Sequence, residues 1–242
     1  MAGMRFALRA PRLLWIWILA LGLLATPARG DERLVYTWKL DGWLGSLAAI
    51  FVPSKGDGVL STETLSGGRL RSELLITSRA SRAGDFFRYG AEVEPASGRT
   101  LVAWSDLVWR GEKKSKRAEV DAENVVDMVS AIASLRRNPP AAPRRLEIWS
   151  DGRLYPVVVV PHGRERRQLA GRPVEARHFE VLGVAVPQRK LWKGQLELWI
   201  ADDPHATPVE IVVARKGARV RLVLVDPPGA PGRQEKTKGG NR

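Results

Sequence analysis

The sequence predicts a mainly β protein, a curved antiparallel sheet or partly closed barrel of about ten strands with one packed helix. Three observations favour this class. Short runs in which apolar residues alternate with polar ones recur along residues 31–225, and clusters of Gly, Asp, Ser and Pro separate them. Seven of the nine tryptophans follow residue 30, in runs rich in Val, Leu and Ile, a composition typical of strands. One segment, near residues 125–135, has the period of a helix instead.

The first half of this region is predicted to be an antiparallel meander. Between Arg33 and Val52, two apolar runs flank Asp41-Gly42, a dipeptide that favours a tight hairpin turn. Lys55-Gly56-Asp57-Gly58 is predicted to form a second turn, and Ser66-Gly67-Gly68 a third. The other expected strands are Val59–Leu65, Arg69–Ser78, Phe86–Glu94 and Leu101–Trp109, the last two joined through the turn Pro95–Gly98.

The one predicted helix covers Val125 to Leu135. Its apolar residues fall on a single face of a helical period, namely Val125, Met128, Val129, Ile132 and Leu135. Acidic residues precede this stripe and two arginines follow it, which suits the helix dipole, and Asn138-Pro139-Pro140 ends the helix. Because such a stripe must be buried, we expect the helix to pack against the concave side of the sheet.

After the prolines, the strand pattern returns. The predicted strands are Leu146–Trp149, Leu154–Val160, Glu175–Val184, Gln195–Ile200, Val209–Ala214 and Ala218–Val225. The turns Ser150-Asp151-Gly152 and Ala170–Pro173 separate the first three of them. The run Tyr155–Val160 is so apolar that it is either a strand buried on both faces or a lipid-contacting surface.

Residues 1–30 are predicted to be a cleavable secretory signal peptide. The first 12 positions include three arginines and no acidic residue, and Leu13–Ala25 is an uncharged apolar stretch. The small residues of Ala28-Arg29-Gly30 then offer a cleavage site before Asp31. The apolar stretch is shorter than the roughly 20 residues that cross a bilayer. An uncleaved anchor, with Trp15 and Trp17 at the membrane interface, is the alternative. The expected parts are therefore the signal peptide 1–30, a single β-rich domain 31–225 and a flexible basic tail 226–242.

The charge balance is strongly basic. The formal net charge is +13, and because residues 1–30 hold four arginines and no acid, the predicted mature chain carries +9. Export argues against nucleic acid as a partner, so the run Lys113–Arg117 is interpreted as a solvated loop. Phospholipid head groups, lipopolysaccharide or an acidic wall polymer would be the anionic partners of such a protein. The chain has no cysteine, which excludes disulfides and lipid attachment through a cysteine.

The residues that could carry chemistry form no recognisable catalytic pattern. The only histidines are His162, His178 and His205, and the chain lacks a G-x-S-x-G elbow that would display a serine nucleophile. Asp202-Asp203 with His205 is the most metal-like cluster. An Asp before Pro204 at the end of a strand is, however, typical of a turn in which its side chain bonds back to the backbone, and we favour this interpretation. The sequence therefore predicts no catalytic residue, no metal ligand and no cofactor, and leaves ligand-binding residues undefined.

The tryptophans that follow residue 30 divide into two groups. Trp38, Trp104, Trp149 and Trp199 lie in strand patterns and are predicted to belong to the core or to the place where the helix docks. Trp43, Trp109 and Trp192 lie near turns, where they could line the mouth of a ligand site.

The closing part of the chain resembles a known family. The segment Leu196–Asp203, LELWIADD, is followed by Thr207–Ile211 and Lys216–Leu222, and the three together resemble the closing signature of domain of unknown function 3108. In that family a strand ends in W-x-S-D-D, and a loop with proline, a second strand, a turn and a last strand follow. Ala201 stands where a serine is common there, and the early strand Leu34–Trp38 and the region 125–160 are similar as well. The resemblance implies an exported bacterial protein with a β-rich fold and no established activity, and it transfers no catalytic residues.

These observations predict a non-enzymatic exported envelope protein, periplasmic or extracellular, that binds or carries an apolar or amphiphilic ligand. A curved sheet with a helix on it can enclose such a ligand, as small barrels do. The alternative is a basic scaffold or interaction protein that docks on anionic envelope components, and a wall or glycan hydrolase is a third interpretation. A hollow space beneath the helix would favour the first interpretation over the second.

Overall fold

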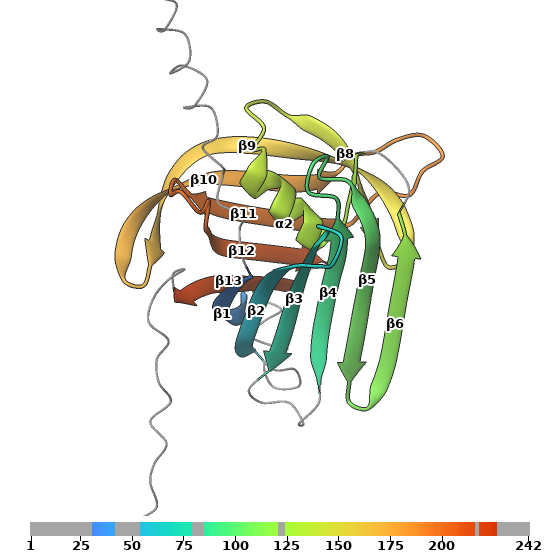
Figure 1. The fold of residues 1–242 in the computed structure, drawn as a ribbon, viewed down its shortest axis with the longest axis horizontal. Helices are drawn as coiled ribbons and strands as arrows, with labels where there is room; N and C mark the ends of the chain where they lie inside the picture. The colour runs from blue at the N-terminus through green and yellow to red at the C-terminus, as the bar shows by residue number, and fades with distance from the viewer. Residues whose placement is uncertain (1–30, 42–53, 79–84, 121–123, 216–217, 227–242) are drawn as a thin grey trace, which may run out of the picture. The chain divides into compact units, whose positions relative to one another are not determined.

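The computed structural model describes residues 31–41, 54–78, 85–120, 124–215 and 218–226. Within them, thirteen strands form a single curved sheet that does not close, in the order β6-β5-β4-β3-β2-β1-β13-β12-β11-β10-β9-β8-β7 (Figure 1). Neighbouring strands are antiparallel except β7 and β8. The strands are β1 Glu32–Asp41, β2 Lys55–Thr64, β3 Leu70–Ser78, β4 Phe86–Val93, β5 Thr100–Trp109, β6 Glu112–Glu119, β7 Val125–Val126, β8 Arg144–Ser150, β9 Arg153–Leu169, β10 Arg172–Gly183, β11 Gly194–Ala201, β12 Pro208–Arg215 and β13 Ala218–Asp226. The predicted fold class is confirmed.

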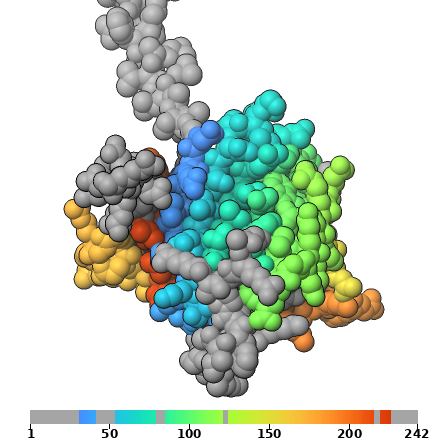
Figure 2. Space-filling model, turned by 90° about the horizontal axis from the view of Figure 1, so that it is seen from below, coloured from blue at the N-terminus to red at the C-terminus, as the bar shows by residue number. Residues whose placement is uncertain are grey.

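The two ends of the described chain meet in the middle of the sheet. Strand β1 pairs with β2 on one side and with β13 on the other, and Trp38 lies opposite Leu222 in the second ladder. In the space-filling view the red β13 borders the blue β1, while β2 to β6 follow on the other side (Figure 2). Strand β13 extends to Asp226, the first residue of the predicted tail, and residues 227–242 lie outside the description.

Helix α2, Met128–Arg137, lies across the concave side of the sheet (Figure 1). Val129, Ile132 and Leu135 are at most 1% exposed, as the apolar stripe predicted. They pack into one core with inward residues of both halves of the sheet, among them Leu34, Tyr36, Leu74, Val159, Leu198 and Leu222. Packing against the concave side is therefore confirmed.

The helix begins later than the sequence predicted. Val125 and Val126 form β7 instead, paired with Glu147 and Ile148, and Val125 packs in a second cluster with Ala103 and Trp149. Asp127 caps the helix: its carboxylate accepts the Ser130 N–H at 2.7 Å, and Ser130 Oγ accepts the Asp127 N–H at 2.7 Å. This reciprocal capping box fixes the first turn after residue 127.

The predicted turn Lys55–Gly58 is wrong, because these residues open strand β2. Gly56 lies beneath Trp38, where an added Cβ would come within 2.5 Å of the indole Nε1. Gly58 leaves room for Leu222, whose Cδ2 would lie 2.8 Å from an added Cβ. The two glycines give room to bulky side chains of other strands, which is a common use of glycine inside a strand.

The lysine-rich run Lys113–Arg117 was predicted to be a loop, and this is also wrong. It forms most of β6, an edge strand paired with β5. Its side chains are solvated as expected, since all but Ala118 are exposed. Charges along an edge strand discourage pairing with another chain, which accounts for a strand of this composition.

The remaining strand predictions are largely confirmed, with two differences in the second half. Strand β9 continues to Leu169, and β10 starts at Arg172, inside the predicted turn. In the run Tyr155–Val160, Val157 and Val159 are buried while Val158 and Val160 are partly exposed, so the run is buried on one face. The predicted turn Asp151-Gly152 is confirmed, with positive φ angles of 52° and 80° that suit a two-residue hairpin. The turn predicted at Asp41-Gly42 lies partly outside the described residues.

Candidate functional site

Part of the space beneath helix α2 is tightly packed. Ile132 and Leu135 belong to one core cluster with Leu34, Tyr36 and Leu74, and none of these five residues is more than 1% exposed. Cavities lined by described residues lie toward the ends of the strands and beside the helix, and these are the candidate ligand sites.

An apolar pocket of about 310 Å³ lies at one end of the sheet. We call it the end pocket. It is lined from both halves of the sheet by Trp38, Leu40, Ile76, Thr77, Ser78, Asp85, Phe86, Phe87, Leu107, Trp109 and Val220. The Trp38 indole Nε1 donates to the Thr77 carbonyl at 2.7 Å, and Trp109 packs on Phe87 with ring centroids 6.2 Å apart. Because its indole donor is satisfied, Trp38 presents a hydrocarbon surface to the pocket.

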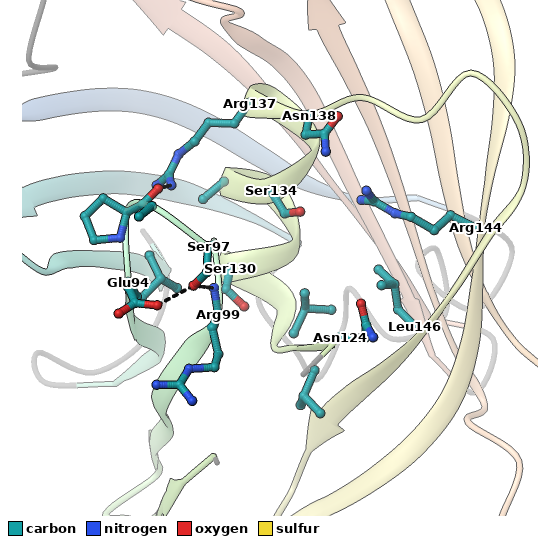
Figure 3. A pocket seen from close by; sticks show the side chains of 17 residues that line it. Glu94, Ser97, Arg99, Asn124, Ser130, Ser134, Arg137, Asn138, Arg144 and Leu146 are labelled. Carbon is teal, nitrogen blue, oxygen red and sulfur yellow. Dashed lines mark hydrogen bonds between the residues drawn. The ribbon is translucent and has the colours of Figure 1, made fainter. Parts of the chain in front are cut away.

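A larger cavity, of about 600 Å³, lies beside helix α2 (Figure 3). We call it the helix-side cavity. Four separate segments line it: the β4–β5 turn, residues 124–126, the middle and end of α2, and the start of β8. Its charged lining residues are Glu94, Arg99, Arg137 and Arg144. Ser97 Oγ bridges the turn, donating to Glu94 and accepting the Arg99 N–H at 3.1 Å.

A third, small cavity of about 80 Å³ reaches the start of the helix at Asp127 and Met128, with Trp192 and Tyr89 among its lining residues. Asp127 is 2% exposed. Burial raises the pKa of its carboxyl to about 6, although hydrogen bonds from Ser130 act in the opposite direction. The helix cap is therefore a titratable group whose charge is costly in the folded protein.

This cap predicts a pH-dependent stability. Because the folded-state pKa is raised, the stabilisation from protonated Asp127 is fully present below about pH 3.8 and is lost as pH rises through about 6. We expect the difference in unfolding free energy between wild type and Asp127→Asn to fall by up to about 3 kcal/mol between these limits. Urea unfolding of both proteins across this range measures it. A difference that is independent of pH would contradict the prediction.

The histidines divide into a stacked pair, His162 and His178, and a separate His205. His178 stacks between His162 and Trp199, at centroid distances of 4.7 and 4.2 Å, on strands β9 to β11. Glu165 contacts His178 Nδ1 at 2.7 Å, and Glu180 contacts His162 Nε2 at 2.8 Å. Burial alone would raise the pKa of Glu165, but hydrogen bonds from Trp199 and His178 outweigh it and lower the pKa. His205 lies apart, in the β11–β12 connection, where its carbonyl accepts from Arg136.

The acidic pair after β11 forms a turn, as predicted. Asp203 Oδ1 accepts the Thr207 N–H at 3.1 Å, while Asp202 pairs with Arg164 at 2.7 Å and with Arg177 at 3.2 Å. Among the described residues, no group of three His, Asp or Glu side chains is placed to hold a metal ion. No helix in that part of the chain is long and apolar enough to cross a membrane.

The tryptophans lie in three kinds of place: the core, the outer face and the cavity linings. Trp38, Trp104, Trp149 and Trp199, predicted to belong to the core or to the place where the helix docks, are all at most 9% exposed, and Trp38 lies in the main core together with the helix residues. Trp104 and Trp199 lie on the outer face, where arginines cover them: Arg117 is 5.2 Å from the Trp104 ring and Arg167 is 4.3 Å from the Trp199 ring. Trp109 lines the end pocket and Trp192 the small cavity. Trp43 lies outside the described residues.

Comparison with known proteins adds distant likenesses. No family model matches this chain, and no curated protein matches it. A beta-barrel-like protein of domain of unknown function DUF1849 from Brucella abortus is 9% identical, with a TM-score of 0.41 over 81% of this chain and 96% of that one. The hypothetical lipoprotein YmcC from Escherichia coli is 14% identical, with a TM-score of 0.38 over 81% and 87%. The Mycobacterium tuberculosis lipoprotein LppX is 11% identical, with a TM-score of 0.31 over 84% and 88%. Likenesses of this size assign neither a ligand nor a partner to this chain.

Proposed function

We propose that this chain is a non-enzymatic, exported envelope protein that binds an apolar or amphiphilic molecule in the end pocket. The observation that supports this proposal most directly is the apolar lining of that pocket, to which Trp38, Leu40, Ile76, Leu107 and Trp109 contribute. A volume of about 310 Å³ lies at the lower end of the range typical of small-molecule sites, and aromatic walls are common in them. The pocket therefore suits one hydrocarbon chain or a small apolar body.

The mouth of the end pocket also supports an amphiphile. Phe87 lines the pocket beside Trp109 and is 37% exposed, so it offers apolar surface that a ligand would cover. Asp85 lines the pocket too, and its carboxylate accepts the Arg110 N–H at 2.9 Å. A ligand with an apolar tail and a polar end would place the tail on Leu107 and Trp109 and leave the polar end near this rim.

The proposed compartment rests on the sequence of residues 1–30, in which a basic segment, an apolar segment and small residues follow one another; these residues lie outside the described part.

The alternative function, docking on anionic envelope components, has less support. Many arginines of the outer face are paired with carboxylates, for example Arg71 with Glu92 at 3.0 Å and Arg221 with Glu210 at 2.8 Å. Paired arginines attract an anionic polymer less than free ones would.

An apolar fluorescent probe tests the proposal. We expect saturable binding at about one site per chain, with energy transfer from tryptophan because Trp38 and Trp109 line the pocket. Leu107→Glu puts a charge in the lining, and since a carboxylate resists transfer into an apolar site, affinity should fall at least about tenfold. Titration of the purified protein, followed by native mass spectrometry of the complex, gives affinity and stoichiometry.

The neighbouring residue supplies a matched control. Val108 is partly exposed, does not line the end pocket and pairs with Phe86 and Lys113. Val108→Glu adds the same charge to the same strand and should leave probe affinity within about twofold of wild type. Equal losses in both variants, or no saturable binding to wild type, would show that the end pocket is not the site.

A further inference from the structure

The lining of the helix-side cavity carries an excess of positive charge. Three arginines and one glutamate line it, a net charge of +2. Arg137 is directed toward the β4–β5 turn, where its Nη1 donates to the Pro95 carbonyl at 3.1 Å, and Arg99 turns away from Ser134 (Figure 3). Arg144 differs from both, because it extends from β8 toward the end of the helix.

Arg144 has no partner in the described part of the chain. Its Nε is buried and lacks a hydrogen bond there, and no carboxylate of the described residues forms an ion pair with it. Because Arg144 is partly exposed and lines the cavity, its guanidinium is open to an acceptor that arrives from outside the chain, and such an acceptor would also satisfy the buried Nε. Guanidinium groups match the oxygens of carboxylates and phosphates in a forked geometry.

Other unbonded polar groups face the same space. Ser134 lies on the helix, Asn138 follows the last turn and Asn124 precedes β7 (Figure 3). None of these three side chains has a hydrogen bond to another described residue. They offer one hydroxyl and two amide groups, from different segments than Arg144.

From this arrangement we infer that the helix-side cavity binds a phosphate group, with Arg144 as its principal cation. Donors that separate segments place around one cavity suit the tetrahedral oxygens of a phosphate better than the two coplanar oxygens of a carboxylate. Arg144 supplies the positive charge for this phosphate, and the other arginines of the lining add to the positive potential of the cavity. Val93, Val126 and Leu146 line the remainder of the cavity, whose volume of about 600 Å³ leaves room for an organic body attached to the phosphate.

The end of the helix opposes an anion, because its last carbonyls carry partial negative charge. This effect is smaller than that of a charge-assisted hydrogen bond from a guanidinium, so Arg144 outweighs it.

The inference does not rest on the proposed function. Strand β4 runs from Phe86 in the end pocket to Val93 in the helix-side cavity, so the two places are roughly 23 Å apart along the strand.

Calorimetric titration with two probes tests the inference and separates the sources of the phosphate. The probes are inorganic phosphate and dihexanoyl phosphatidic acid below its micellar concentration. Similar affinity for both would identify free phosphate as sufficient, whereas much tighter binding of the lipid would identify a phosphorylated lipid head group. In either case Arg144→Gln should weaken binding at least about tenfold, because the variant loses both the charge and the fork.

Arg145→Gln is the matched control. Arg145 is the next residue of β8, is exposed and does not line the cavity, so this variant makes the same change in net charge. It should keep phosphate affinity within about twofold of wild type. Equal losses in the two variants would overturn the inference, since they would indicate general attraction to a basic protein. Failure of both probes to saturate, or saturable binding of octanoate in their place, would overturn it as well. Leu107→Glu should leave phosphate binding unchanged, which distinguishes this site from the end pocket.

Discussion

Val129→Asp is expected to unfold the domain or to leave it barely folded. Val129 is fully buried on the face of helix α2 that packs on the sheet. An unpaired carboxylate at this position would lose its hydration without gaining a partner, at a cost of several kcal/mol. Domains of this size have a total stability of about 5–15 kcal/mol, so the substitution removes a large part of it. Urea unfolding followed by tryptophan fluorescence measures the loss.

Ala133→Asp provides the comparison on the same helix. Ala133 is partly exposed and faces the helix-side cavity, so an aspartate there stays hydrated and lies among arginines. Its cost should be limited to helix propensity, below about 1 kcal/mol. If Val129→Asp were tolerated as well as this variant, the helix would be peripheral to the core and the central packing described above would be wrong.

The periodicity of the sequence was sufficient for the class of fold and for the helix face. Val129, Ile132 and Leu135 were predicted on one face, and all three are buried against the sheet. Val125 fitted the same spacing but belongs to β7, because hydrophobic spacing alone does not mark where a helix starts. The signal that does mark it is Asp127 with Ser130, a capping box with serine at the position where Glu or Gln is usual.

The errors in strand assignment have a common physical origin. Gly56 and Gly58 were interpreted as turn residues because glycine most often relieves backbone strain, whereas here they make room for Trp38 and Leu222 of other strands. The run Lys113–Arg117 has little strand propensity, and its strand is held by pairing with β5. In both cases, contacts with residues distant in the sequence decide the local structure.

The candidate sites could not be predicted from the sequence. The end pocket combines residues of β1, β3, β4, β5 and β13, and the helix-side cavity combines four segments. Their assembly depends on strand order, since β1 pairs with β13 only once the chain ends have met. Trp109 was noted as a pocket candidate from its place near a turn, but no local pattern distinguishes Arg144 from its exposed neighbour Arg145.

Replacing Arg136 should cost more than any other single truncation of a charged residue in the described part of the chain. Arg136 Nη1 and Nη2 hold the Glu32 carboxylate at 2.6 and 2.8 Å, Nε donates to the Ala206 carbonyl at 2.9 Å, and Nη2 also donates to the His205 carbonyl at 3.0 Å. The arginine is 7% exposed and connects the last turn of the helix to β1 and to the β11–β12 connection.

Arg136→Met is therefore expected to destabilise the protein by about 3–5 kcal/mol, because it leaves the Glu32 carboxylate and two carbonyls without their donor. Arg137→Met is the control: Arg137 is exposed and donates to the Pro95 carbonyl at 3.1 Å from the surface, so its replacement should cost less than about 1 kcal/mol. The double variant Glu32→Gln/Arg136→Met should recover part of the stability, since no unpaired charge remains. Thermal and urea unfolding of wild type and the three variants measure these differences in stability. Equal losses of stability for Arg136→Met and Arg137→Met would show that the Glu32–Arg136 ion pair does not hold the helix to the sheet. A double variant less stable than Arg136→Met would show the same.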